Sequence, residues 1–252
     1  MQSRIAILIT AFERPSLLRK SVESVLNNWQ SNWVLIIADQ SQEEDKVMKK
    51  WEVECPNFYY YHLPFNCGLS YARNFLVAKA MGFKCEYCIL SADSIEFDES
   101  MKRIDEILPL FDGIYKLGRV GFYLKNRINW EGWLDLIPNE CFELELIDTT
   151  SSGLYRCNCI KNFFIARTLS LLDVEWDEKL KMAEHECHTY RYAQKWETLY
   201  SNYYSGNYIG TKDGIYGQYR QQNWMEGIDY LGKKYNLQTW IRYKNPELFD
   251  RS

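Results

Sequence analysis

The chain has 252 residues, which is enough for one large domain or two small domains that share a core. Its formal net charge of −4 gives no reason to expect a nucleic acid, whose phosphates require a basic surface. The residues after Met1 do not form a signal peptide, and no apolar stretch reaches the roughly 20 residues of a membrane span. We therefore expect a cytoplasmic protein without a transmembrane segment, which leaves peripheral contact with a membrane surface open.

Two close cysteine pairs, Cys85 with Cys88 and Cys157 with Cys159, could in principle form a zinc site with four thiolates. However, Cys85 and Cys88 look like part of a buried strand, where alternation would send them to opposite faces. Reduced thiols are also usual in the cytosol. We therefore expect reduced, partly buried cysteines.

The first 95 residues or so alternate between predicted strands and helices. Residues 4–12 form a continuous apolar run that is typical of a strand buried on both faces, and Pro15 suits the first turn of the helix that follows. This alternation predicts an α/β fold with a mostly parallel central sheet flanked by helices. The remaining predicted elements are strands at 33–38, 58–62 and 87–90 and helices at 42–54 and 70–80.

The second half of the sequence is less regular. Strands are predicted at 120–124 and 141–146, and the loop between them carries two tryptophans. A helix is expected from Glu184 to about Trp196, and the tail from Tyr200 looks loop-dominated. No repeat or linker divides the chain, so we expect a single domain.

Polar side chains follow three of the predicted strands. A parallel sheet binds ligands at the carboxyl ends of its strands, where Thr10, Asp39 and Asp93 would lie. Asp39 fits a helix cap or turn, or an acceptor for a base or ribose hydrogen bond. Asp93 fits a cap, or a carboxylate that holds Mn²⁺ or Mg²⁺ against a diphosphate.

The segment Glu184–Arg191 offers acids and histidines at the start of a helix. Glu184, His188 and Arg191 share one helical face and could form a salt-linked cluster. Alternatively, an acid or histidine here could act as a general base. The Trp130-x-x-Trp133 pattern fits either a packing staple or a flat platform for a sugar ring.

The order of these segments resembles the family 2 glycosyltransferases of the GT-A fold. The resemblance covers roughly residues 4–100 and 158–195. The later segment is similar to the N-acetylgalactosaminyl- and galactosyltransferase-like branches. The matching segments are ILITAFERPSLLRKSVESVLNN, VLIIADQS, NCGLSYARN, YCILSADSIEF and KNFFIARTLSLLDVEWDEKLKMAEHECHTYR.

The resemblance implies a GT-A-type fold in which the two halves of a single domain have different functions. Residues 1–100 would bind the nucleotide sugar, and residues 101–252 would bind the acceptor and supply the catalytic base. Asp39 would contact uracil, Arg73 would lie near the base or diphosphate, and Asp93 would hold the metal. The implied donor-binding residues are Thr10, Ala11, Phe12, Glu13, Asp39, Arg73, Ser91, Ala92 and Asp93, and the implied acceptor contacts are Trp130, Trp133 and Arg191.

Three positions depart from the family pattern. Ala38 and Ser91 stand where the family usually has aspartates, so Asp93 is the sole clear carboxylate for a metal. The usual base position is occupied by His185, which Glu184 and Glu186 flank. We rank the candidate bases in the order His185, Glu184 and Glu186.

The resemblance thus implies an inverting, metal-assisted glycosyltransferase. It would move a hexose or N-acetylhexosamine from a UDP-sugar to a hydroxyl of a glycan or lipid-linked glycan. Because acidic residues of the pattern are missing, the alternative is a degenerate module that binds a glycan or nucleotide without turnover. Nucleotidyl transfer is less favoured, because no glycine-rich phosphate loop with a following lysine stands near the first strand.

Overall fold

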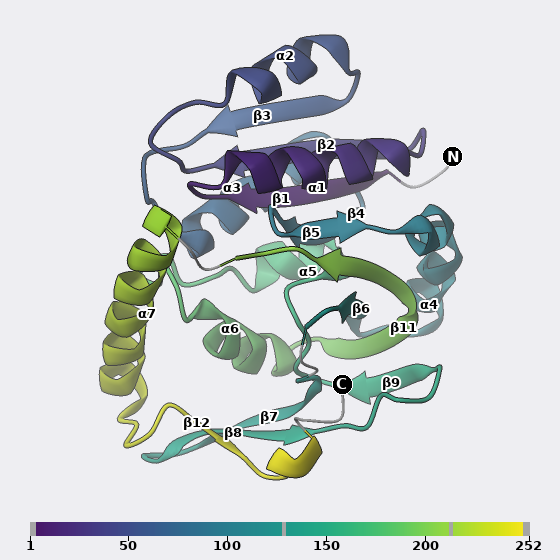
Figure 1. Cartoon of the computed structure of the whole chain (residues 1–252). Helices are drawn as coiled ribbons and strands as arrows, with labels where there is room; N and C mark the ends of the chain where they lie inside the picture. Colours follow the sequence, from purple (N-terminus) through teal and green to yellow (C-terminus); the bar gives the residue numbers. More distant parts are fainter. Residues whose placement is uncertain (1–3, 128–129, 212–213, 249–252) are drawn as a thin grey trace.

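The computed structural model describes residues 4–127, 130–211 and 214–248. Its first part alternates strands and helices as the sequence predicts (Figure 1). Strands β1 and β2 are buried along their whole length, which explains their continuous apolar sequences. The elements are β1 (Ile5–Ala11), α1 (Pro15–Asn27), β2 (Trp33–Asp39), α2 (Lys46–Glu54), β3 (Phe58–His62), α3 (Leu69–Gly82) and β4 (Tyr87–Ala92).

The second part contains more regular structure than predicted. The expected loop-dominated tail from Tyr200 is wrong, because β11 and the 22-residue helix α7 occupy most of it. Trp133 belongs to a strand rather than a loop. The elements are β5 (Ile95–Phe97), η1 (Glu99–Ile107), α4 (Leu108–Gly113), β6 (Leu117–Lys125), β7 (Gly132–Ile137), β8 (Cys141–Leu146), β9 (Leu154–Cys157), β10 (Phe164–Arg167), α5 (Thr168–Asp173), α6 (Glu184–Ala193), β11 (Glu197–Tyr208), α7 (Gly214–Tyr235), β12 (Ile241–Tyr243) and η2 (Pro246–Leu248).

The large sheet is mixed, and the strands that come from the first part of the chain are parallel to one another. Its strand order is β3-β2-β1-β4-β10-β6-β11-β5, with β9 paired to β11. Strands β3, β2, β1 and β4 are parallel, whereas β10 runs antiparallel to both of its neighbours. A small sheet of order β12-β8-β7 lies apart from it (Figure 1). The parallel strands therefore bring the residues that follow β1, β2 and β4 to one edge.

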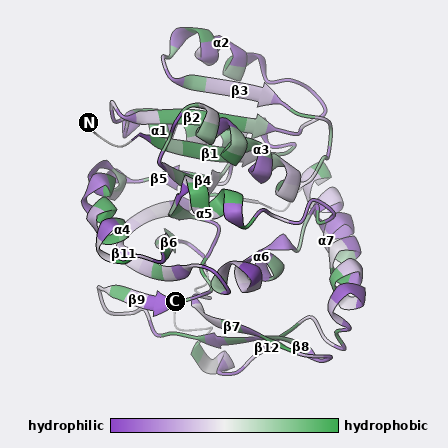
Figure 2. Cartoon of the chain, turned by 180° about the vertical axis from the view of Figure 1, so that it is seen from behind, coloured by the Kyte–Doolittle hydropathy of each residue, from purple (hydrophilic) through white to green (hydrophobic). Residues whose placement is uncertain are grey.

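Apolar side chains fill both faces of the large sheet, and strands such as β2 are coloured as hydrophobic (Figure 2). In β1, for example, Ile7 packs into one core and Leu8 into the other. All eight cysteines carry free thiols. Cys85 precedes β4 and Cys88 lies within it.

A close backbone contact joins the early and late parts of the chain. Gly68, which precedes α3, has φ of 99°, and a Cβ atom there would lie 2.7 Å from the Cα atom of Lys181. The N–H of Leu69 donates to the carbonyl of Lys181 at 3.1 Å. Glycine is therefore required both by the backbone conformation and by the space. This contact sets the start of α6 beside the carboxyl ends of the first strands.

Helix α7 runs along one side of the molecule, from the loops after the first strands to the small sheet (Figure 1). Its Asn223 side chain donates to the Asn66 side chain at 2.8 Å. A Cβ atom on Gly227 would lie 2.5 Å from the carbonyl oxygen of Met182, so this side of α7 packs tightly on the segment before α6. The helix thus covers the edge of the sheet at which ligands are expected.

Candidate active site

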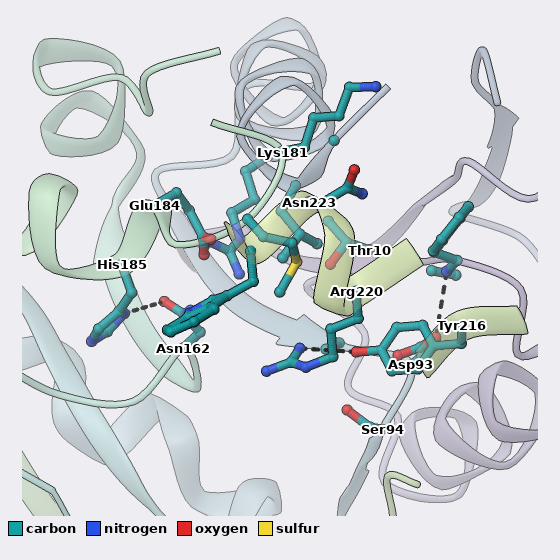
Figure 3. A pocket seen from close by; sticks show the side chains of 18 of the residues that line it. Thr10, Asp93, Ser94, Asn162, Lys181, Glu184, His185, Tyr216, Arg220 and Asn223 are labelled. Atoms are coloured by element: carbon teal, nitrogen blue, oxygen red, sulfur yellow. Dashed lines mark hydrogen bonds and ion pairs between the residues drawn. The ribbon is translucent and has the colours of Figure 1, made fainter. Parts of the chain in front are cut away.

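A cavity of about 250 Å³ opens at the carboxyl ends of β1 and β4. Side chains from the sheet, from α6 and from α7 point into it (Figure 3). The sheet side contributes Thr10, Ala11, Phe12, Arg14, Ala92, Asp93 and Ser94. The opposite side contributes Arg73, Arg127, Trp130, Lys161, Asn162, Lys181, Glu184, His185 and Glu186, and α7 contributes Tyr216, Arg220, Asn223 and Trp224.

Asp93 lies in the cavity wall, and Arg14 neutralises it. The Nε atom of Arg14 donates to Oδ2 of Asp93 at 3.0 Å, and its Nη2 atom forms a short ion pair with Oδ1. The Phe12 N–H lies 3.5 Å from Oδ2. Burial raises the pKa of Asp93 to about 6, against the opposing effect of Arg14, so the carboxylate is mostly charged at neutral pH.

Asp39, in contrast, does not line the cavity. Its Oδ1 atom accepts hydrogen bonds from the N–H and hydroxyl of Ser41, and its Oδ2 atom accepts one from the Tyr60 hydroxyl at 2.8 Å. The carboxylate is thereby held within the loop after β2. A contact with the nucleobase stays a prediction.

Two further predicted donor residues also lie outside the cavity lining. Glu13 turns toward the loop after β2, where its Oε1 atom accepts from the Gln42 N–H at 2.6 Å and its own N–H donates to Ser41. Ser91 is buried within β4. Of the nine predicted donor residues, the structure therefore gathers Thr10, Ala11, Phe12, Arg73, Ala92 and Asp93 around the cavity.

Glu184 forms an ion pair with Arg73 in the wall of the cavity. The two side chains form a short ion pair, and both are almost fully buried. Burial alone would raise the pKa of Glu184, but the nearby Arg73 charge leaves it lowered. Glu184 therefore stays ionised and has little tendency to take up a proton.

His185 is packed among other groups. Its Nδ1 atom is 3.1 Å from the Asn162 amide oxygen (Figure 3). Its ring lies 4.5 Å from the Trp130 ring, and its Nε2 atom is 3.7 Å from the Cys159 sulfur. Burial lowers the pKa of His185 to about 3, so the ring is neutral at physiological pH. Both ring nitrogens are thus engaged within the protein.

Glu186 differs from its two neighbours, because it lines the cavity without an ion-pair partner among the described residues. Desolvation by burial raises the pKa of its carboxyl group to about 8, with a smaller contribution from the charge of Glu184. A carboxylate with this proton affinity is suited to accept a proton near neutral pH. The roles of all three candidate bases stay predictions, and these properties make Glu186 the base that we take forward in the proposed function.

Of the predicted acceptor contacts, only one reaches the cavity. Trp130 lines it beside His185. Trp133 lies in β7 with 44% of its surface exposed, outside the cavity lining, and Arg191 lies near the end of α6, also outside it. Acceptor roles for Trp133 and Arg191 stay predictions.

The cavity is more basic than the chain as a whole. Six cationic side chains line it, against the three carboxylates of Asp93, Glu184 and Glu186. Among the described residues, three of these cations form no ion pair, whereas Arg14, Arg73 and Lys161 do. The three for which the described ranges offer no carboxylate partner are Arg127, Lys181 and Arg220.

Sequence reasoning missed most of these cations and all of the α7 contribution. Arg14 could have been found, since it directly follows β1 at the ligand-binding edge of the sheet. Arg220 could not, because nothing in the sequence indicates that α7 folds back over this edge. Here Tyr216 stacks on the Arg14 guanidinium at 3.7 Å. Its hydroxyl accepts a hydrogen bond from Arg220 at 3.1 Å (Figure 3).

The residues around Asp93 do not fit a resident Mn²⁺ or Mg²⁺ site. Within residues 4–127, 130–211 and 214–248, no group of three His, Cys, Asp or Glu side chains is placed to hold an ion. Asp93 is the single carboxylate at the end of β4, and Arg14 occupies both of its oxygens. The metal predicted at Asp93 would have to displace this guanidinium.

Residues 6–103 match the model of the family described as "Glycosyl transferase family 2". The chain carries a family 2 glycosyltransferase domain. No curated protein sequence matches the chain significantly. The family resemblance expected from the sequence is therefore confirmed for residues 6–103, and these residues include those that the sheet contributes to the cavity.

Solved structures support the fold of the chain. The 1–349 portion of S. aureus TarS is 12% identical, with a TM-score of 0.58, over 91% of this chain and 72% of that one. The mannosyltransferase PcManGT of Pyrobaculum calidifontis, solved with GDP-Man and Mn²⁺, is 9% identical, with a TM-score of 0.60, over 92% of this chain and 65% of that one. The predicted GT-A-type α/β fold is thereby confirmed.

The chain spans only 37% of the longer TarS chain, at 12% identity and a TM-score of 0.57. Other TarS structures were solved with UDP and with UDP-GlcNAc. Among the described residues, no helix has the length and apolar character needed to cross a bilayer.

Proposed function

We propose that this domain transfers a hexose or N-acetylhexosamine from a UDP-sugar to a hydroxyl of a glycan or lipid-linked glycan, with inversion at the sugar carbon. One observation carries the proposal. Within the part of the chain that the structure describes, a single cavity combines three cations that lack a carboxylate partner with one carboxylate, Glu186, that lacks a cation. The cations suit the diphosphate of a nucleotide sugar, and the carboxylate suits the acceptor proton.

The donor side of the cavity follows from its charge and position. Arg127, Lys181 and Arg220 offer N–H donors to phosphate oxygens, and they lie at the sheet edge that binds nucleotides in α/β folds. Residues 1–100 supply the sheet wall, as proposed from the sequence, but α7 joins them with Tyr216 and Arg220. A UDP donor agrees with the TarS complexes, whereas the PcManGT complex contains GDP-Man.

The transfer itself is a single displacement. The Glu186 carboxylate takes the proton of the acceptor hydroxyl as that oxygen forms a bond to the anomeric carbon. The bond from this carbon to the diphosphate oxygen breaks, and the diphosphate leaves with the electron pair. The cations stabilise the negative charge that develops on the leaving group. Attack on the face opposite the leaving group inverts the configuration.

The acceptor would enter from the side of residues 101–252, beside Trp130. An indole ring at this position offers a flat apolar surface to a sugar, next to Glu186 on α6. No step of this proposal uses Mn²⁺ or Mg²⁺, because Arg14 already occupies the Asp93 oxygens.

A donor panel tests the proposal. The purified chain is incubated with UDP-GlcNAc, UDP-GalNAc, UDP-glucose, UDP-galactose and GDP-mannose, and release of nucleoside diphosphate is measured with and without oligosaccharide acceptors. We expect release from a UDP-sugar that an acceptor stimulates. Binding of UDP without turnover would favour the non-catalytic module, and release from GDP-mannose alone would overturn the choice of UDP.

A further inference from the structure

The guanidinium of Arg14 lies at the place where a metal ion would meet Asp93. It contacts both carboxylate oxygens, and the side chain of Arg14 is only 11% exposed and that of Asp93 only 1%. The Tyr216 ring stacks on the guanidinium plane at 3.7 Å, which fixes its orientation. Arg14 thus joins the sheet wall and α7 through one side chain.

The donor atoms of Arg14 are only partly used by these contacts. Nε and Nη2 face Asp93, whereas Nη1 donates to the Thr211 carbonyl at 3.3 Å, which is long for such a hydrogen bond. A guanidinium has five N–H donors in a fixed fork, and it pairs well with both carboxylate and phosphate. The edge that faces away from Asp93 can therefore donate to a phosphate oxygen.

We propose that Arg14 takes the place of the divalent cation, bridging Asp93 to the donor diphosphate, so that this glycosyltransferase binds its nucleotide without a metal. The inference rests on the proposed function, because it concerns the same cavity. It differs from the metal-assisted reaction that the resemblance implies. Arg127, Lys181 and Arg220 add the remaining positive charge along the diphosphate.

The direct test measures UDP binding by calorimetry in excess EDTA and again with Mn²⁺, with GDP run in parallel. We expect the affinity of the unmodified protein for UDP to be the same under both conditions. A requirement of the unmodified protein for Mn²⁺ would overturn the inference but leave the proposed function standing. Failure of both nucleotides to bind under either condition would overturn the two together.

Variants test whether Arg14 is the group that binds the diphosphate in place of a metal ion. Arg14→Ala should weaken UDP binding in EDTA by roughly 10- to 100-fold, the loss of one charge-assisted contact. It also frees the Asp93 oxygens, so added Mn²⁺ should restore part of the affinity. The matched control is Arg19→Ala, which removes a guanidinium paired with Asp45 outside the cavity and should leave the affinity unchanged.

A second variant covers the case in which Arg14→Ala does not fold. Arg220→Gln removes a partly exposed cation that forms no ion pair among the described residues, so its loss leaves no buried charge. It should weaken UDP binding in EDTA, again by roughly 10- to 100-fold. Unchanged affinity of Arg14→Ala, or of Arg220→Gln where Arg14→Ala cannot be made, would contradict the inference.

Discussion

The acidic side chains on two sides of the cavity lie in different environments. We call the side formed by the sheet, with Asp93, the sheet wall and the side formed by α6, with Glu186, the helical wall. On the sheet wall, burial raises the pKa of Asp93 to about 6 even though Arg14 binds both of its oxygens. On the helical wall, burial raises the pKa of Glu186 to about 8, and no cation pairs with it among the described residues. The first acid remains ionised at neutral pH, whereas the second is close to its titration point.

This difference suits the two acids to different roles, one in binding an anionic ligand and the other in proton transfer. A carboxylate that holds a guanidinium organises positive charge for an anionic ligand but cannot readily take up a proton. A carboxyl group with a raised pKa and a free edge on the cavity can do so. Glu184, two residues before Glu186, repeats the first pattern through its ion pair with Arg73, so α6 contributes one acid of each kind.

The largest expected effect comes from Glu186→Gln. The amide keeps the shape of the side chain but cannot accept the acceptor proton, so the turnover number should fall by about 10²- to 10⁴-fold. Calorimetry should show unchanged binding of UDP. The control is Glu175→Gln, the same chemical change at an exposed position. Full activity of Glu186→Gln would exclude Glu186 as the base.

Glu184→Gln should affect stability more than binding. It leaves the buried Arg73 charge without its partner, which costs about 3–5 kcal/mol of the free energy of unfolding. Urea denaturation measures this cost. As a control, Glu54→Gln breaks an exposed i,i+4 pair with Lys50 and should cost at most about 0.5 kcal/mol. Equal stability of the two variants, with activity lost only in Glu184→Gln, would instead assign Glu184 to the chemistry.

The sheet wall could be predicted from the sequence, because its signals are local. A continuous apolar strand followed by a polar residue identifies β1 and β4, and parallel pairing brings their ends together. The pairing of Arg14 with Asp93 joins residues 79 positions apart, so no local pattern reveals it. The same holds for Asp39, whose Tyr60 partner lies 21 positions away.

Helix α7 was missed for a different physical reason. Of its fully buried residues, Asn223, Gly227 and Leu231, only Leu231 is apolar, and the other apolar side chains that pack on the protein, such as Ile228, are only partly buried. Hydrophobic periodicity is the main signal for a helix, and it is nearly absent here. Tertiary contacts such as the hydrogen bond from Asn223 to Asn66 hold the helix instead.

The pH dependence of turnover tests whether Glu186 is the base, and the expected effect is smaller than that of Glu186→Gln. Below the raised pKa of Glu186, about 8, its carboxyl group is protonated and cannot act as a base. The value of kcat/KM should therefore rise about tenfold from pH 7 to pH 9 and level off above the pKa. His185→Gln should leave this midpoint unchanged, since the pKa of His185 is about 3. A midpoint that disappears in His185→Gln would restore the histidine as base.

The smallest expected effect distinguishes the two tryptophans at the acceptor side. Trp130 lines the cavity beside His185, whereas Trp133 is 44% exposed on β7 outside it. Loss of an aromatic contact worth about 0.5–1.5 kcal/mol should raise the acceptor KM roughly 2- to 12-fold in Trp130→Ala. Trp133→Ala should leave the KM unchanged. Each variant removes one indole ring, so an equal rise of the acceptor KM in both would show that the acceptor extends along β7, beyond the cavity.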